Sequence, residues 1–109
     1  NFGPPSALNA SVGELVSLMA SHWGNAQYLD LSTGSDPLHE SVLLKLNCDK
    51  ALHYLDWTSV WDFPTTVKAT IDWYTLYYST QLCNIHQFTL SQIECYSINA
   101  SAINLPWAL

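Results

Sequence analysis

The chain has 109 residues, enough for one small domain, and 49% of them are hydrophobic, which excludes an intrinsically disordered protein. Charged residues make up only 11%, and the net charge of −6 comes from nine acidic residues against three lysines, with no arginine. This balance argues against nucleic-acid binding, which relies on clustered lysines and arginines to displace phosphate counterions. A chain so poor in charge also tends to keep apolar surface for a partner, so we expect a homo-oligomer or a bound second domain.

Nothing in the sequence predicts a membrane or secreted protein. No apolar run reaches the roughly 18 residues of a membrane span, and no signal peptide is recognisable, so a cytoplasmic protein is expected. The three cysteines, Cys48, Cys83 and Cys95, form neither a zinc motif nor an even-numbered disulfide framework, and we expect reduced thiols. The chain begins at Asn1 without a methionine, which suggests a fragment or a processed product.

The first predicted elements are a short strand and a helix. The opening apolar residues break at Gly-Pro-Pro, as the end of a strand running into a loop does. Ser11 and Glu14 then have the spacing of a capping box, which marks a helix start. Apolar residues at helical spacing follow as far as Trp23, and Gly24 ends the pattern.

Two further strands and a short helix are predicted in the middle of the chain. Residues 27–31 alternate between polar and apolar side chains, and residues 41–46 form a second strand candidate. Asn47 or Asp49 can cap the short helix that follows. Trp57 and Trp61 follow this short helix, and they either anchor it in the core or stack on a base or sugar.

The second half of the chain is predicted to be helical. Asp62 or Thr65 can cap a helix from about Pro64 to Tyr78, and proline suits its first turn. Its inward stripe is expected to consist of Val67, Ile71, Tyr74 and Tyr78. Residues 88–96 predict another short helix, and the uncharged residues 97–109 predict a tail or a strand-like appendage. The predicted fold class is therefore α/β, mainly helical with a few short strands.

Few residues form a pattern that carries chemistry. The glycines are too dispersed for a dinucleotide-binding turn, and no two histidines have the spacing of a metal site, so no cofactor or metal is predicted for this chain. His39 and Glu40 stand in a polar loop before a strand, where they either contact a ligand or merely terminate the strand. Lys45 is either an edge-strand surface lysine or a charge directed at a ligand.

Several segments, taken in order, resemble one known family. They are Asn1-Phe2-Gly3-Pro4, Pro37-Leu38-His39-Glu40, the run Leu-Lys-Leu-Asn-Cys-Asp-Lys-Ala at residues 44–51, Leu55-Asp56-Trp57 with Trp61, and residues 88–93 with Tyr96. This order is similar to that in the C-terminal part of the extended short-chain dehydrogenase/reductases, in particular the CDP-glucose 4,6-dehydratases. The resemblance covers residues 1–96 and leaves 97–109 as an unassigned tail. Family positions for aspartate, glycine and proline hold Asn47, Asp56 and Ser59 here.

The resemblance implies a substrate lobe without a catalytic centre. Enzymes of this family oxidise C4 of the hexose with bound NAD, eliminate water across C5 and C6, and return the hydride to C6. Their glycine-rich NAD turn and Tyr-x-x-x-Lys pair do not occur in this sequence, so the lobe is expected to be inactive alone and to need a Rossmann domain. The substrate-binding residues it implies are Phe2, Gly3, His39, Glu40 and, more weakly, Lys45. The alternative is a self-associating or partner-binding module derived from such a lobe.

Overall fold

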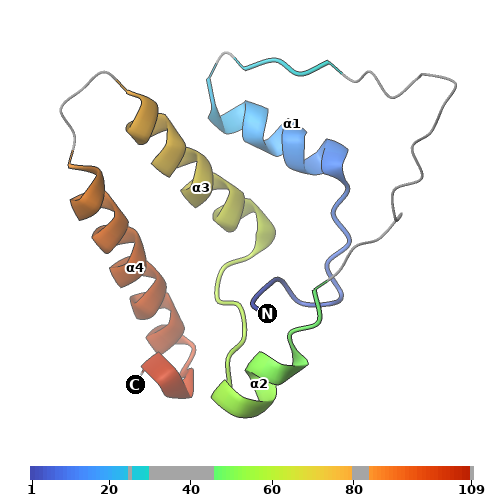
Figure 1. Cartoon of the computed structure of the whole chain (residues 1–109), viewed down its shortest axis with the longest axis vertical. Helices are drawn as coiled ribbons and strands as arrows, with labels where there is room; N and C mark the ends of the chain where they lie inside the picture. The colour runs from blue at the N-terminus through green and yellow to red at the C-terminus, as the bar shows by residue number, and fades with distance from the viewer. Residues whose placement is uncertain (25, 30–45, 80–83, 109) are drawn as a thin grey trace, which may run out of the picture.

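The computed structural model describes residues 1–24, 26–29, 46–79 and 84–108. The elements in these ranges are α1 (Val12–His22), α2 (Asp49–Leu55), α3 (Phe63–Tyr78), α4 (Ile85–Ala102) and the short 3-10 helix η1 (Pro106–Ala108) (Figure 1). Helices cover 63% of the described part of the chain, so the mainly helical prediction is confirmed. The α/β class is not supported, because the described ranges contain no strand.

Two strand predictions are wrong where the structure describes them. Residues 1–3 and 26–29 have no regular structure. A strand needs a backbone ladder, whereas Asn1 reaches Asn47 only through its side-chain amide, at 3.4 Å, and Tyr28 reaches Ser17 only through its hydroxyl, at 2.8 Å. The remainder of the 27–31 prediction and nearly all of 41–46 lie outside the described residues.

The start of α1 is held by the predicted capping box. The Ser11 hydroxyl oxygen accepts the backbone N–H of Glu14 at 3.2 Å, and the Glu14 carboxylate accepts the backbone N–H of Ser11 at 2.7 Å. These hydrogen bonds, from the backbone and then the side chain of Ser11, lower the pKa of Glu14 from its ordinary value. The helix ends before Gly24, whose φ of 83° is in the left-handed region that glycine adopts without strain.

Helix α2 ends at a residue in the left-handed conformation. Asp56, at the position where the resembled family has glycine, has a φ of 49° and closes the helix. Its N–H donates to the Leu52 carbonyl at 2.9 Å, and the N–H of Trp57 donates to that of Ala51 at 3.3 Å. A left-handed conformation is strained for a residue with a Cβ and free of strain for glycine.

We therefore expect Asp56→Gly to stabilise the protein by about 0.5–1 kcal/mol, because glycine removes this backbone strain. Urea denaturation followed by circular dichroism measures the change. The matched control is Thr58→Gly, two residues along in an exposed position with no positive φ, where glycine should destabilise. An equal response of the two variants would contradict the backbone explanation.

The longest helices, α3 and α4, differ in how well their sequences predict them. The Asp62 carboxylate caps α3 by accepting the N–H of Thr65 at 2.9 Å, as predicted. Helix α4 is longer than the predicted 88–96, because Asn84 caps it at one end and it continues to Ala102 at the other. The expected tail is thus largely helix, closed by η1 rather than by a strand.

The helices form a layer that is thin for a protein of this length. The molecule measures 53 × 41 × 17 Å, and a helix with its side chains is about 10–12 Å across. Helix α3 lies between α1 and α4 and packs on both (Figure 1). The radius of gyration is 17.0 Å, against about 13 Å for a compact domain of this size. Domains usually bury their apolar faces between two layers, whereas the described helices form one layer.

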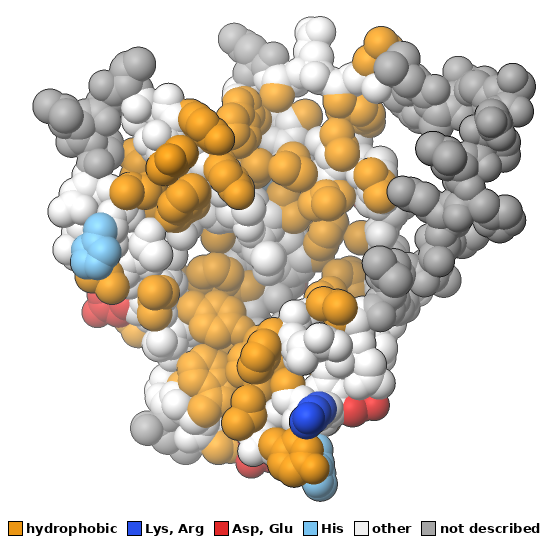
Figure 2. All heavy atoms as spheres, in the orientation of Figure 1, with side chains coloured by type: hydrophobic (Ala, Val, Ile, Leu, Met, Phe, Trp, Pro, Cys, Tyr) orange, Lys and Arg blue, Asp and Glu red, His pale blue; other side chains and the backbone are white. Residues whose placement is uncertain are grey.

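Few described side chains form a core. The buried hydrophobic residues are Ala51, Val67, Ile71 and Ala100. Large apolar side chains are exposed on every α-helix, and Figure 2 shows them gathered over much of one face. Val67 and Ile71 confirm half of the predicted α3 stripe, whereas Tyr74 and Tyr78 are 42% and 67% exposed. The predicted inward stripe is therefore buried in the first half of α3 and exposed in the second half.

Candidate functional site

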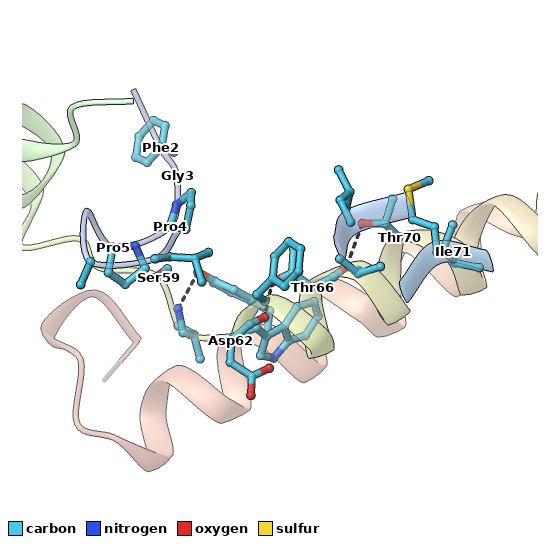
Figure 3. A pocket seen from close by; sticks show the side chains of 18 of the residues that line it. Phe2, Gly3, Pro4, Pro5, Ser59, Asp62, Thr66, Thr70 and Ile71 are labelled. Carbon is cyan, nitrogen blue, oxygen red and sulfur yellow. Dashed lines mark hydrogen bonds between the residues drawn. The ribbon is translucent and has the colours of Figure 1, made fainter. Parts of the chain in front are cut away.

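The principal cavity lies between the N-terminal segment and the helices. It has a volume of about 990 Å³ and is enclosed by the N-terminal segment, α1, the connector between α2 and α3, the first turns of α3 and one residue of α4 (Figure 3). Leu15 and Met19 of α1 line it together with Val67 and Ile71 of α3. Its volume is at the upper end of the range usual for small-molecule sites.

The N-terminal wall depends on a close approach of two segments. The Phe2 ring meets Trp57 edge to face, with centroids 5.0 Å apart. A Cβ placed on Gly3 would lie 3.2 Å from the Leu46 Cδ1 and 3.5 Å from the Cys48 sulfur. A side chain at position 3 would therefore require the Leu46 side chain to shift by a few tenths of an ångström.

Two aromatic rings, Trp61 and Tyr96, also line the cavity, and a third ring lies behind Tyr96. Tyr96 of α4 meets Trp61 edge to face at 5.0 Å and stacks on Trp107 of η1 at 5.9 Å. The Tyr96 hydroxyl oxygen accepts the backbone N–H of Val60 at 3.3 Å (Figure 3). This tyrosine therefore fixes the connector between α2 and α3 against the C-terminal helix.

Polar side chains that line the cavity make hydrogen bonds at the cap and in the first turns of α3. Hydrogen bonding to the Thr65 side chain, and secondarily to its backbone N–H, lowers the pKa of Asp62, so this capping carboxylate stays ionised near neutral pH. Thr66 donates its hydroxyl proton to the Asp62 carbonyl at 2.8 Å, and Thr70 donates its own to the Thr66 carbonyl at 2.9 Å. The described lining contains no paired nucleophile and base. The described lining can therefore bind an apolar or mixed surface.

The predicted site residues divide into two groups. Phe2 and Gly3 line the cavity together. His39, Glu40 and Lys45 lie outside the described residues. The lining contributed by α1 was missed, although the helical spacing of its apolar residues marked them as an inward face.

Trp57 and Trp61 were expected either to anchor the core or to stack on a ligand. Both are half-buried, and both line the cavity while contacting other rings. The two roles are therefore compatible at these positions.

The described residues include no glycine-rich turn of the kind that binds a dinucleotide. Such a turn joins a strand to a helix, and Gly3, Gly13 and Gly24 lie apart in described ranges that contain no strand. Over those same ranges no group of three His, Cys, Asp or Glu side chains could hold an ion. Cys48 and Cys95 are free thiols, while Cys83 is outside the described residues. None of the helices in the described part of the chain is long and apolar enough to cross a bilayer.

Comparison with known proteins adds no relative. No family model, no curated protein and no solved structure matches this chain. The resemblance to the extended short-chain dehydrogenases therefore stays a prediction.

Proposed function

We propose that this chain is a substrate lobe of the nucleotide-sugar 4,6-dehydratase type, which binds a sugar nucleotide at its principal cavity and acts with a Rossmann domain. The observation that carries the proposal is the cavity beside Phe2 and Gly3, the two described residues that the resemblance assigns to the substrate pocket. The NAD, the catalytic tyrosine and the lysine belong to the Rossmann domain in this proposal. The chain alone is accordingly inactive.

The lobe's own part is to bind the substrate, orient it and exclude water. The edge-to-face pair of Phe2 and Trp57 presents an apolar rim to the ligand. The ionised Asp62 carboxylate disfavours a phosphate on its side of the cavity, because like charges repel. The diphosphate is therefore assigned to the Rossmann domain, and the sugar end is assigned to the lobe.

A second candidate function is self-association. The single helical layer and the exposed apolar side chains of α2, α3 and α4 support it, since a second copy could provide the missing layer. Light scattering across a concentration series separates the candidates. A dimer that persists without ligand favours self-association, whereas a monomer that binds CDP-glucose favours the substrate lobe.

Calorimetric titration with CDP-glucose tests the main proposal. We expect a dissociation constant of about 1 mM for the isolated chain, because half of the binding groups belong to the partner domain. Phe2→Ala should weaken binding by about fivefold through loss of its ring contacts with Trp57 and the ligand.

Tyr54→Ala is the matched control for this titration. Tyr54 is an exposed ring on α2, and it is not among the residues that line the cavity. Its removal should leave the affinity unchanged. Absence of heat at millimolar CDP-glucose, for the chain alone and for the chain mixed with a Rossmann domain of this family, would overturn the proposal.

A further inference from the structure

A second, smaller recess lies between α3 and α4, next to the principal cavity. Its volume is about 340 Å³, within the range of small-molecule sites. Aromatic rings, neutral polar groups and one alanine line it: Trp61, Trp73, Tyr74, Thr66, Thr70, Gln92 and Ala69. We call it the aromatic recess. No charged side chain contributes to its lining.

The first indole, Trp73, is fixed in place by its neighbours. Its Nε1–H donates to the Thr89 hydroxyl oxygen at 2.9 Å, and that hydroxyl donates to the Ile85 carbonyl at 2.9 Å. The ring also stacks on Tyr77 at 5.1 Å with 9° between the planes and meets Tyr74 edge to face at 5.3 Å. Its orientation is thus set before any ligand arrives.

The second indole, Trp61, is fixed from the α4 side. It meets the Tyr96 ring at 5.0 Å, with 79° between the planes, and the Tyr96 hydroxyl is held by the backbone of Val60. Because both indoles are already fixed, they lose little conformational entropy when a ligand binds. Their contacts with a ligand therefore contribute more to the binding free energy than those of mobile side chains would.

The polar groups of the aromatic recess are mainly hydrogen-bond acceptors. Thr66 and Thr70 have committed their hydroxyl protons to backbone carbonyls, which leaves their oxygens free to accept. Gln92 donates from Nε2 to the Ala69 carbonyl at 2.8 Å. Its Oε1 can therefore also accept a hydrogen bond. Acceptors without a nearby cation disfavour phosphate or carboxylate and favour a ligand with several hydroxyl donors.

We propose that the aromatic recess binds a neutral pyranose, with a C–H face of the sugar on the indoles and its hydroxyls donating to Thr66, Thr70 and Gln92. A pyranose has both features, an apolar face of ring C–H groups and an edge of hydroxyl donors. The aromatic recess shares Trp61, Thr66 and Thr70 with the principal cavity and extends away from it to Trp73, Tyr74 and Gln92. The proposal rests on these lining residues and does not depend on the proposed function.

Saturation-transfer NMR on the full chain tests the proposal, with methyl glucoside, methyl galactoside and methyl mannoside as probes and with cytidine and glucose 1-phosphate as comparisons. We expect transfer to the ring C–H protons of at least one neutral glycoside. Trp73→Ala should weaken binding by about tenfold. Thr70→Val, an exposed and nearly isosteric change, should weaken it about threefold, and it keeps the test decisive if the tryptophan variant does not fold.

Two control variants locate the signal. Trp23→Ala removes an exposed tryptophan at the end of α1, away from the aromatic recess, and Phe2→Ala alters only the principal cavity. Both should leave glycoside binding unchanged. Transfer to no glycoside, stronger binding of cytidine or glucose 1-phosphate, or equal loss in Trp23→Ala would each overturn the proposal.

Discussion

Replacing Ile71 with alanine is expected to destabilise the protein by about 2–3 kcal/mol, a large share of the few kcal/mol that hold a small domain folded. Ile71 is 1% exposed and is the largest fully buried side chain of the described chain. It belongs to α3, the helix on which both α1 and α4 pack. The loss should lie toward the lower end of the usual range, because the vacated space joins an open cavity that water can fill.

Urea denaturation followed by far-UV circular dichroism measures this loss. Ile93→Ala is the matched control, since it makes the same chemical change on α4 at a side chain that is 58% exposed. We expect its effect to stay within about 0.5 kcal/mol. Similar losses for the two variants would show that α3 does not carry the core.

The second large effect is expected from overpacking at the C-terminal end of α4. Ala100 is fully buried, and its carbonyl accepts the N–H groups of Ile103 and Leu105 at 3.2 and 3.1 Å, which turns the chain back. This turn brings Trp107 onto Tyr96. Ala100→Leu should therefore destabilise by about 1–3 kcal/mol and separate these two rings.

Near-UV circular dichroism reports on the separation, because a stacked aromatic pair gives a signal that disappears when the rings move apart. Ala102→Leu is the control on the same helix, at an exposed position. It should preserve both the signal and the stability. If Ala100→Leu is as stable as this control, then η1 does not pack on α4 as described.

The sequence was informative wherever local hydrogen bonding decides the structure. The capping box at Ser11 and the Asp62 cap follow from the spacing of a few residues, and both are present. Such features need no knowledge of the rest of the fold. The same is true of the stop at Gly24.

Prediction failed where contacts between residues far apart in the sequence determine the secondary structure. The alternation at 27–31 and the apolar opening segment look like strands, yet in their described residues neither gains the backbone partner that a strand requires. Helix α4 was predicted too short because its apolar residues do not keep to one face after Tyr96. Its extension is stabilised by the burial of Ala100 and by η1, which the local pattern does not reveal.

The candidate site was predictable only in part. Phe2 and Gly3 were assigned from the resemblance and do lie together on the principal cavity. The aromatic recess was not foreseen, because Trp73 and Gln92 are far apart in sequence and meet only when α3 packs on α4. The single signal available was the frequency of aromatic residues along α3.

The attachment of the N-terminal wall has a consequence for how the principal cavity opens. Its side-chain hydrogen bond, from Asn1 to Asn47, joins residues 46 positions apart, and closing a loop of that length costs about 3 kcal/mol of chain entropy. Among the described residues, the contacts that oppose this cost include that exposed hydrogen bond, the edge-to-face ring pair and the contact at Gly3. We expect the wall to detach by local opening before α3 unfolds, because α3 carries the buried residues Val67 and Ile71. A ligand or a partner domain that contacts Phe2 would hold the wall closed.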